Sequence, residues 1–443
     1  MPVWACLATG LFVMTFLAFS GTVSSCPRFT VILFFLTGVF FIFGVTAGIR
    51  LEKPVPKAQI SWLESKGTVV TERSWGNRRA VIIKTSKGKF LCKLPSGRLF
   101  REGDRVSLEG KIRYFDPAPS SREFDEDSYW RARGVLGSIQ DPDLVKEGRD
   151  WLTFSAWRRF LKERILLTIP QRTRGYILAS WLGARDPNLS EKHRKWGTSH
   201  ILAISGFHVG IVALGLRRIT RRRVLAPSIF MWGYVLLSGG AASALRAALM
   251  FQTAFLGDLL GRPVRAVNAV SAAAVMILLW RPWWFWDLGW RLSVTAALVL
   301  GSIVSTREWR RFWAGIPIVW YVTGAFISRS FGSVPVAGMI MNIFAVPLFG
   351  FLLPAMSLIV LPGLCGIPGA GILLRIMEML LWSLHYCAQG LSLMIPFQAG
   401  SDFFPVIPVC AMLVYLPLRG AGIARSRSAC AGVFSALFAG ILF

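Results

Sequence analysis

Two histidines and a serine stand in a short apolar run, HILAISGFHVG, that extends from His200 to Gly210. On one continuous helix Ser205 and His208 face the same way, and His200 lies about two turns toward the helix start. Ionisable groups are costly at membrane depth and mark a pathway or a site there. The run therefore predicts either the lining of a polar route or a set of interhelical hydrogen bonds.

Gly206 and Gly210 stand four residues apart in the same run, a spacing that lets a second helix approach closely. Catalysis by Ser205 is a weaker interpretation. The serine lacks the Gly-x-Ser-x-Gly turn of hydrolases, and no carboxylate in the same helix would orient His208. We assign no catalytic residue to this chain, although a membrane-embedded hydrolase stays a third hypothesis.

An arginine in an apolar span is the second candidate. Arg246 stands in SALRAALM, too far from either end of its span to reach water easily. It needs a partner or water, and Asp287 or Glu378 could supply the carboxylate. A structural ion pair and an anion-conducting role both fit this pattern.

The third candidate is the apolar run 335–354, which Asn342, Pro347 and Pro354 interrupt. Breaks in a membrane helix are tolerated where they are buried in protein or line a water-filled cavity. We expect residues 335–362 to form one broken span, although a proline kink in an ordinary span gives the same pattern.

The elements that carry these groups belong to a membrane protein. Hydrophobic residues make up 54% of the 443 residues, and repeated windows of about 20 residues, the length of a spanning helix, lack charge. We predict roughly twelve spans, the first two at residues 5–24 and 29–49. The net charge of +27 favours a polyanion or anionic lipid headgroups as partners.

A polar region follows the second span and has the pattern of short strands. Apolar residues alternate with polar ones at Val106, Leu108, Gly110, Ile112 and Tyr114, which is the period of a half-buried strand. Earlier strands are expected at residues 67–73, 79–85 and 89–94. Several short strands separated by turns predict a small β-barrel or sandwich.

A basic, aromatic helix is expected at residues 151–169. Its apolar face comprises Trp151, Phe154, Trp157, Leu161 and Ile165. Its basic face comprises Arg158, Arg159, Lys162 and Arg164. This pattern is typical of a helix lying in the membrane interface, and a core helix of the soluble region is the alternative.

Basic loops predict the orientation of the spans. Five arginines crowd into residues 217–223, so this loop is expected on the cytoplasmic side. Counting spans from it puts the arginines of 262–265 and 307–311 on the same side. The count places the β region on the outer side.

The ordered motifs over residues 171–361 resemble the membrane domain of the ComEC family of DNA-uptake channels. The resemblance runs from WLGARDPNLSEKHRKWGTSHILAISGFHVG through SALRAALM to Arg262, Asn268, Pro282, Asp287–Gly289, Leu292–Ser293, Asn342 and Pro347. Residues 51–140 are similar to that family's N-terminal OB-like barrel. The chain departs from the family pattern at residues 120–123 and at Arg291, where many members carry glutamine.

The resemblance implies a polytopic α-helical protein of the bacterial inner (cytoplasmic) membrane with an inserted extracytoplasmic, all-β OB-like domain. We divide the chain into two transmembrane helices (1–50), the OB-like domain (51–150), a basic amphipathic interfacial helix (151–178) and a competence or channel domain (179–443). The implied function is import of single-stranded DNA during natural transformation. A small-anion or lipid-linked-substrate transporter is the alternative.

Two sets of residues follow from this hypothesis. The expected DNA pathway comprises His200, Ser205, Gly206, His208, Ser243, Arg246, Asp287 and Asn342. The expected DNA-binding surface comprises Lys84, Lys87, Lys89, Lys93, Arg98, Arg101, Lys111 and Arg113. Bases would stack on Trp75, Phe90, Phe100, Tyr114 or Phe115.

Some motifs are missing from the chain. Many ComEC members continue into a metallo-β-lactamase-like domain, but this chain has four histidines and no cluster for a dinuclear metal site. It also has no Gly-x-x-x-x-Gly-Lys-[Ser/Thr] phosphate loop. We therefore expect a channel without metal, cofactor, nuclease or ATPase activity. Its expected partners are membrane lipids, an extracytoplasmic DNA receptor, a separate nuclease and a cytoplasmic ATPase or helicase, with self-association left open.

Overall fold

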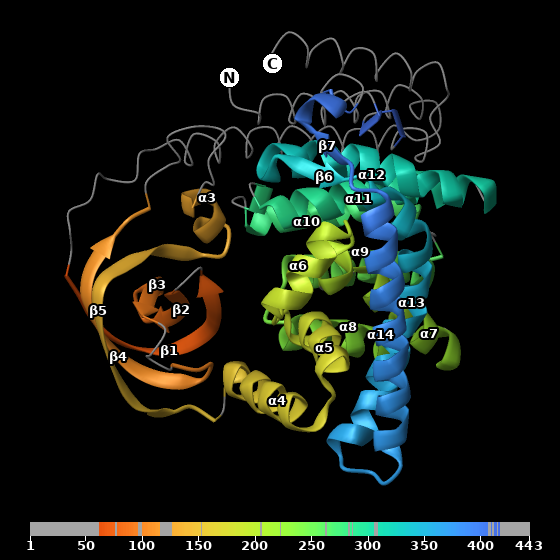
Figure 1. The fold of residues 1–443 in the computed structure, drawn as a ribbon. Coiled ribbons are helices and arrows are strands. Elements are labelled where there is room, and N and C mark those ends of the chain that lie inside the picture. Colours follow the sequence, from red (N-terminus) through yellow and green to blue (C-terminus); the bar gives the residue numbers. More distant parts are fainter. Residues whose placement is uncertain are drawn as a thin grey trace.

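The computed structural model describes residues 62–75, 78–95, 100–115, 126–151, 153–203, 206–221, 223–261, 264–281, 284–285, 287–304, 309–405, 409, 412–413 and 415–416. The two expected N-terminal spans lie outside these residues. A β-barrel and a helical region stand side by side, joined by one helix between them (Figure 1).

Five strands close the barrel in the order β1-β2-β3-β5-β4. They are β1 (Trp62–Trp75), β2 (Arg78–Thr85), β3 (Gly88–Pro95), β4 (Asp104–Arg113) and β5 (Val135–Arg149). Neighbouring strands are antiparallel except β3 and β5, which are parallel. The four strands expected from the sequence are confirmed. The fifth strand, β5, was not predicted, because Asp141, with φ 43°, and Pro142 interrupt its apolar–polar alternation at a bulge.

The barrel is filled by the inward side chains of its strands. Val106, Leu108 and Ile112 are buried, as the alternation predicted. Phe90 and Phe100 are buried in the same core, so the expectation that they stack bases is wrong. An outward patch on β2 and β3 is covered by the short helix α3 (Glu126–Arg131).

Helix α4 (Phe154–Thr168) turns its basic face to the barrel. Arg159 Nη1 pairs with Asp104 Oδ1 at 2.8 Å, and Lys162 Nζ pairs with Glu72 Oε1 at 3.0 Å. Asp104 is wholly buried. These cations are therefore engaged within the protein and join α4 to β1 and β4.

The opposite face of α4 is open. Phe154, Trp157 and Phe160 are 62%, 65% and 58% exposed. The expected apolar face included Ile165 in place of Phe160, and this detail is wrong because Ile165 is buried against the helical region. The exposed stripe follows residues three apart along the helix.

The helical region contains one further series of elements. In chain order these are α5 (Gln171–Leu182), α6 (Pro187–Lys195), η1 (Ser199–Leu202), α7 (Gly206–Ile219), α8 (Leu225–Leu237), α9 (Ala242–Leu259), α10 (Ala266–Trp280), α11 (Leu288–Val304), α12 (Trp309–Phe331), β6 (Ser333–Pro335), α13 (Ala337–Leu364), α14 (Ala370–Met394), β7 (Gln398–Gly400) and η3 (Ser401–Phe403). Helices α10 and α12 run across the direction of α14 (Figure 1). The described helices do not form one parallel bundle.

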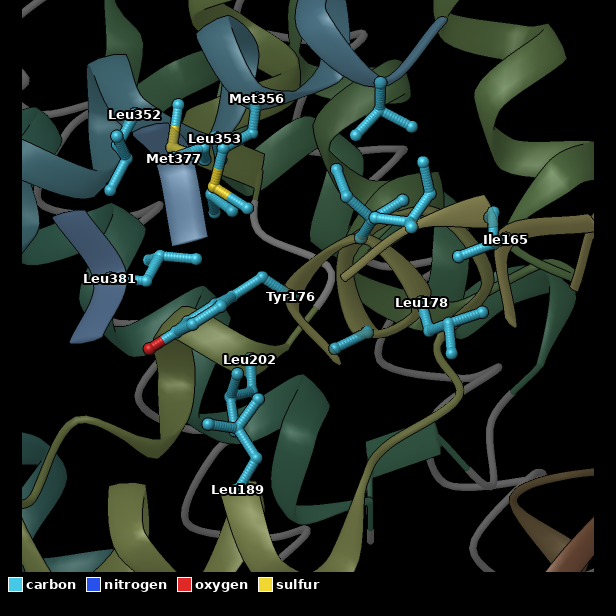
Figure 2. Packing of buried hydrophobic residues seen from close by; sticks show 14 of the residues in the cluster. Ile165, Tyr176, Leu178, Leu189, Leu202, Leu352, Leu353, Met356, Met377 and Leu381 are labelled. Atoms are coloured by element: carbon cyan, nitrogen blue, oxygen red, sulfur yellow. The ribbon is translucent and has the colours of Figure 1, made fainter. Parts of the chain in front are cut away.

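Three apolar cores hold the described helices together. One lies among α7 to α11, the second packs α5 and α6 against α13 and α14, and the third joins α12 to β6 and β7. Figure 2 shows Tyr176 and Leu178 of α5 in the second core, with Met356 of α13 and Leu381 of α14 nearby. The weakly apolar stretch 171–198 thus supplies part of the core.

Helix α13 is long and apolar enough to cross a membrane, judged by length and composition, and among the described helices it alone meets this test. Shorter apolar helices occur at Leu225–Leu237, Ala266–Leu278 and Leu288–Ile303. The count of about twelve spans stays a prediction. The expected break in 335–362 is wrong, because α13 runs through Pro347 and Pro354. Each proline removes only one donor, and α13 stays packed against α5 and α14.

The basic loops that follow α7 and α9 were predicted to lie on the same side, and the ends of these two helices do lie together. Arg217 at the end of α7 pairs with Asp258 at the end of α9, at 2.7 Å. The barrel and α4 contact the other ends. Arg158 of α4 lies against the turn at Gly239, and Arg133 of the barrel pairs with Asp287. The barrel and the 217–223 loop therefore lie at opposite ends of α7 to α9.

We expect Arg159→Met to loosen α4 from the barrel. The substitution leaves the buried Asp104 with Lys146 as its one ion-pair partner among the described residues. Breaking a buried pair costs about 3–5 kcal/mol. Hydrogen exchange at the amides of α4 and β4 measures this loss as a lower free energy of local opening.

Arg105→Met is the matched control, because Arg105 pairs with Asp150 at 3.4 Å while its own side chain is 60% exposed. Exposed pairs contribute about 0–1 kcal/mol. Equal losses in the two variants would show that the Arg159 pair does not hold α4 in place.

Candidate functional site

The run that carries the two histidines is not one helix. Helix α6 ends before Gly197, whose φ is +69°, and the chain then forms the 3₁₀ turn η1. Ala203 is extended, and α7 begins at Gly206. His200 lies in η1, so its expected place on the helix of His208 is wrong. A left-handed glycine ends α6 and redirects the chain.

Two of the expected pathway residues cannot be placed in full. Ser205 lies outside the described residues, and the side chain of His208, a residue of α7, is not described. His200 is described. Its side chain is exposed.

The glycines of the run bring α7 against α9, as their spacing predicted. A Cβ atom on Gly206 would lie 3.2 Å from Cβ of Ala247, and one on Gly210 would strike the Phe251 ring. The same Gly206 Cβ would lie 4.0 Å from the carbonyl oxygen of Ser243. The start of α7 therefore touches the SALRAALM segment.

Helix α13 approaches the same run from another side. A Cβ atom on Gly197 would lie 2.6 Å from Cα of Gly338, so the two backbones are in close contact. One turn on, Asn342 Nδ2 donates a hydrogen bond to the Gly197 carbonyl oxygen at 3.4 Å. The structure thus brings Gly206 to α9 near Ser243 and Gly197 to α13 near Asn342.

Arg246 is buried in the second turn of α9, with 3% of its surface exposed. Neither Nη nitrogen has a hydrogen-bond partner among the described residues. Asp287 attracts it electrostatically without forming a direct ion pair with it. Glu378, the other expected partner, accepts hydrogen bonds from the backbone amides of Arg172 and Thr173, both at 2.9 Å. It caps α5, so its expected role beside Arg246 is wrong.

Asp287 joins the helical region to the barrel. Its Oδ2 pairs with Arg133 Nη2 at 3.1 Å, and its Oδ1 accepts the Trp290 amide at 2.9 Å. Its charge also attracts Arg291, whose Nε donates to the Phe285 carbonyl at 2.8 Å. One carboxylate thus faces three arginines, and the surroundings are net positive.

The expected DNA-binding cations of the barrel divide into groups. Lys84, Lys87 and Lys89 lie on the β2–β3 hairpin, and Lys111 and Arg113 lie on the exposed side of β4. Two others are engaged in ion pairs within the protein, Lys93 with Glu126 at 2.6 Å and Arg101 with Glu163 at 2.9 Å. Arg98 lies outside the described residues, and the side chain of Trp75 is not described.

Glu163 of α4 pairs with both Arg101 and Arg159. Hydrogen bonds from Arg159, and then from Arg101, hold the pKa of the Glu163 carboxyl below its usual 4.5. Arg101 is therefore a contact between the barrel and α4, and its role in DNA binding stays a prediction.

A buried polar cluster was not foreseen. Tyr176 Oη lies 2.7 Å from His193 Nε2 and 2.8 Å from His385 Nε2, and His193 Nδ1 lies 2.8 Å from Thr198 Oγ1. Tyr176 and His385 are far apart in the sequence, so no local spacing could reveal the cluster. It anchors the chain immediately before η1.

Comparison with known proteins now adds to the geometry. The family model described as Competence protein matches residues 182–426, more than half of the chain. The chain belongs to this family. The matched region begins at the end of α5 and includes every expected pathway residue from His200 to Asn342, whereas the barrel and α4 precede it.

One relative of this Competence family member is ComE operon protein 3 of Bacillus subtilis (strain 168), 34% identical over 148 residues. The alignment covers 31% of this chain and 19% of the relative, so the chain matches about a fifth of that protein's length. No solved structure matches the chain.

The Arg133–Asp287 pair is expected to hold the barrel to the α10–α11 turn. A double-mutant cycle with Arg133→Gln and Asp287→Asn should give a coupling energy of about 1–3 kcal/mol, because the pair is partly buried. Asparagine keeps an acceptor for the Trp290 amide. Thermal unfolding of the four proteins in detergent measures the coupling.

The exposed pair Lys66–Glu147, with an N···O distance of 2.7 Å, is the control cycle. Its coupling energy should be only roughly a few tenths of a kcal/mol. The inference fails if the two cycles give the same coupling.

Proposed function

We propose that this protein forms the membrane conduit through which single-stranded DNA enters a bacterial cell during natural transformation. Membership of the Competence protein family supports a role in DNA uptake. The observation that carries the conduit is Arg246, a buried arginine with two unpaired Nη nitrogens on the part of α9 that touches the start of α7.

The chemistry of Arg246 fits a phosphate. A buried guanidinium without acceptors is costly, so the protein retains it at a price in stability. Phosphodiester oxygens are acceptors with the spacing of its two Nη donors. Asp287 attracts the same arginine and so limits how tightly it holds a phosphate. A pathway needs this moderation, because too tight a grip stops movement.

Other groups of the expected pathway would accompany the strand. His200 reaches solvent from η1, and the Asn342 Oδ1 atom has no hydrogen-bond partner among the described residues. Backbone without helical hydrogen bonds is tolerated at membrane depth where it lines a polar cavity. The chain leaves α-helical geometry at Gly197 and forms a 3₁₀ turn and then extended backbone at Ala203. In this proposal Ser205 and His208 continue the same lining.

The membrane would contact α13 and the open face of α4. Phe154, Trp157 and Phe160 form an exposed aromatic stripe, which is typical of helices that lie at the lipid interface. The basic face of α4 is turned to the barrel, so the lipid contact is apolar. We place the barrel on the outer side and the 217–223 loop in the cytoplasm of a multi-pass inner-membrane protein.

This lipid contact can be measured with brominated lipids, which quench tryptophan at the interface. We expect Trp157→Phe to remove part of the quenching, because Trp157 points outward from α4. Trp62, which is 62% exposed on the barrel, is the control, and Trp62→Phe should leave the quenched fraction unchanged. Equal effects would mean that α4 does not face lipid.

Other proteins would supply the driving force and the processing of the strand. Each inward-moving phosphate works against about 2.3 kcal/mol per 100 mV of membrane potential. The residues of this chain contain no phosphate loop for nucleotide hydrolysis. We therefore propose a passive conduit served by an outer DNA receptor, a nuclease and a cytoplasmic ATPase or helicase.

A transporter for small anions or lipid-linked substrates is the second candidate, since Arg246 could also close a site for one anion. Protein in a planar bilayer distinguishes the two. A saturable flux of small anions that DNA does not alter would favour the transporter.

Arg246→Gln tests the conduit. A hydrogen bond to a charged group contributes about 1.5–3 kcal/mol, so DNA import should fall roughly tenfold or more. Labelled DNA is followed into the cytosol of competent cells, with protein levels in the membrane matched by immunoblot. Arg218→Gln removes an exposed arginine at the end of α7 and should import normally. Normal import by Arg246→Gln would sink the assignment, whereas DNA bound outside but not imported supports it.

A further inference from the structure

A cluster of cations lies where the barrel faces the end of α10. Lys84 of β2 stands directly opposite Lys89 of β3 in the antiparallel register. Their neighbours Ile83 and Phe90 are buried in the barrel core. Because side chains alternate along a strand, both lysines point outward. Like charges directly opposite in a sheet repel each other.

The helical region adds a third cation. Arg281 follows the last residue of α10, with its Cζ atom 4.4 Å from the ring centroid of Trp280 and 5.4 Å from that of Trp284. Burial, and then the charges of Arg281 and Lys84, lower the pKa of the Lys89 ammonium. The geometry agrees with this, because Lys89 stands opposite Val135 in the β3–β5 register and the nearby Arg133 pairs with Asp287, six residues after Arg281.

These cations differ from their neighbours in having no carboxylate. Lys93 of β3 pairs with Glu126, and Arg133, which lies just before β5, pairs with Asp287. Lys84, Lys89 and Arg281 form no ion pair with any described residue. The three unpaired cations are therefore available to bind an external anion.

The aromatic residue beside the cluster narrows the choice of anion. Trp280 is 63% exposed, and the guanidinium of Arg281 lies over its ring. Lysines that follow a backbone together with an accessible aromatic ring are the recurring parts of sites for single-stranded nucleic acid. A small inorganic anion has no base that could stack on the ring.

We propose that Lys84, Lys89 and Arg281 form a phosphate-binding site for single-stranded nucleic acid, with Trp280 as a stacking surface for a base. This inference rests on the proposed function and extends it. Asp287 lies in the same turn as Arg281 and faces Arg246. The turn between α10 and α11 thus connects the barrel lysines to the arginine inside the helical region, and the site passes the strand from one to the other.

The test uses the full-length protein in nanodiscs of neutral phosphatidylcholine, with a fluorescein-labelled oligothymidylate followed by anisotropy over a range of salt concentrations. The triple variant Lys84→Gln/Lys89→Gln/Arg281→Gln should bind at least about tenfold more weakly. Its plot of log affinity against log salt should lose about 0.7 in slope for each lost phosphate contact. Arg281→Lys should keep the slope, since the charge remains.

The matched control removes the same charge from exposed positions elsewhere. It is Lys66→Gln/Lys195→Gln/Arg218→Gln. The inference is overturned if the triple variant binds the oligonucleotide as tightly as this control does. It is also overturned if the triple variant loses affinity only for phosphatidylglycerol vesicles, because the ligand is then a lipid headgroup.

Failure of the larger proposal looks different. If the unmodified protein does not bind the oligonucleotide, the conduit itself is wrong. If the unmodified protein binds the oligonucleotide and the triple variant binds it equally well, only the site at Lys84, Lys89 and Arg281 is wrong. Lys84→Gln alone changes an exposed side chain and gives a folded variant for the same measurement.

Discussion

A wholly buried aspartate fixes the relation between the barrel and the helices. Asp104 receives the Arg101 amide at 2.9 Å, Lys146 at 3.1 Å and Arg159 at 2.8 Å. An unpaired carboxylate at that depth would destabilise the protein by roughly several kcal/mol, so α4 and β4 must stay together. The Arg133–Asp287 pair adds a second attachment at the α10–α11 turn. With both in place, the β2–β3 lysines face the end of α10.

The distribution of acidic residues explains which cations remain available. The chain has 23 acidic residues against 50 lysines and arginines, so most cations have no acidic partner of their own. Several carboxylates lie at the contacts between the barrel, α4 and the α10–α11 turn. Arg246 inside α9 and the Lys84–Lys89 pair are left without a direct ion pair among the described residues. Stability and ligand binding thus draw on different cations of one basic surface.

Local patterns could be predicted from the sequence, and contacts distant in the chain could not. The alternation of Val106, Leu108 and Ile112 predicts an inward face because a strand repeats every two residues. Arg246 was recognisable because a charge in an apolar span needs an explanation. By contrast, Glu378 caps α5 across 206 residues of sequence, and the Tyr176–His385 contact spans 209. Only the packing of α14 against α5 creates them.

The position of the helix break shows most clearly how packing decides what a pattern means. Prolines predicted the break in α13, yet buried contacts with α5 and α14 keep that helix continuous. The break lies instead after Gly197, where a left-handed glycine meets the backbone of Gly338. No larger residue at either position could allow this approach, and without it Asn342 could not reach the Gly197 carbonyl. Two glycines and an amide therefore fix the turn between α6 and η1, and His200 lies exposed in η1 rather than on the helix of His208.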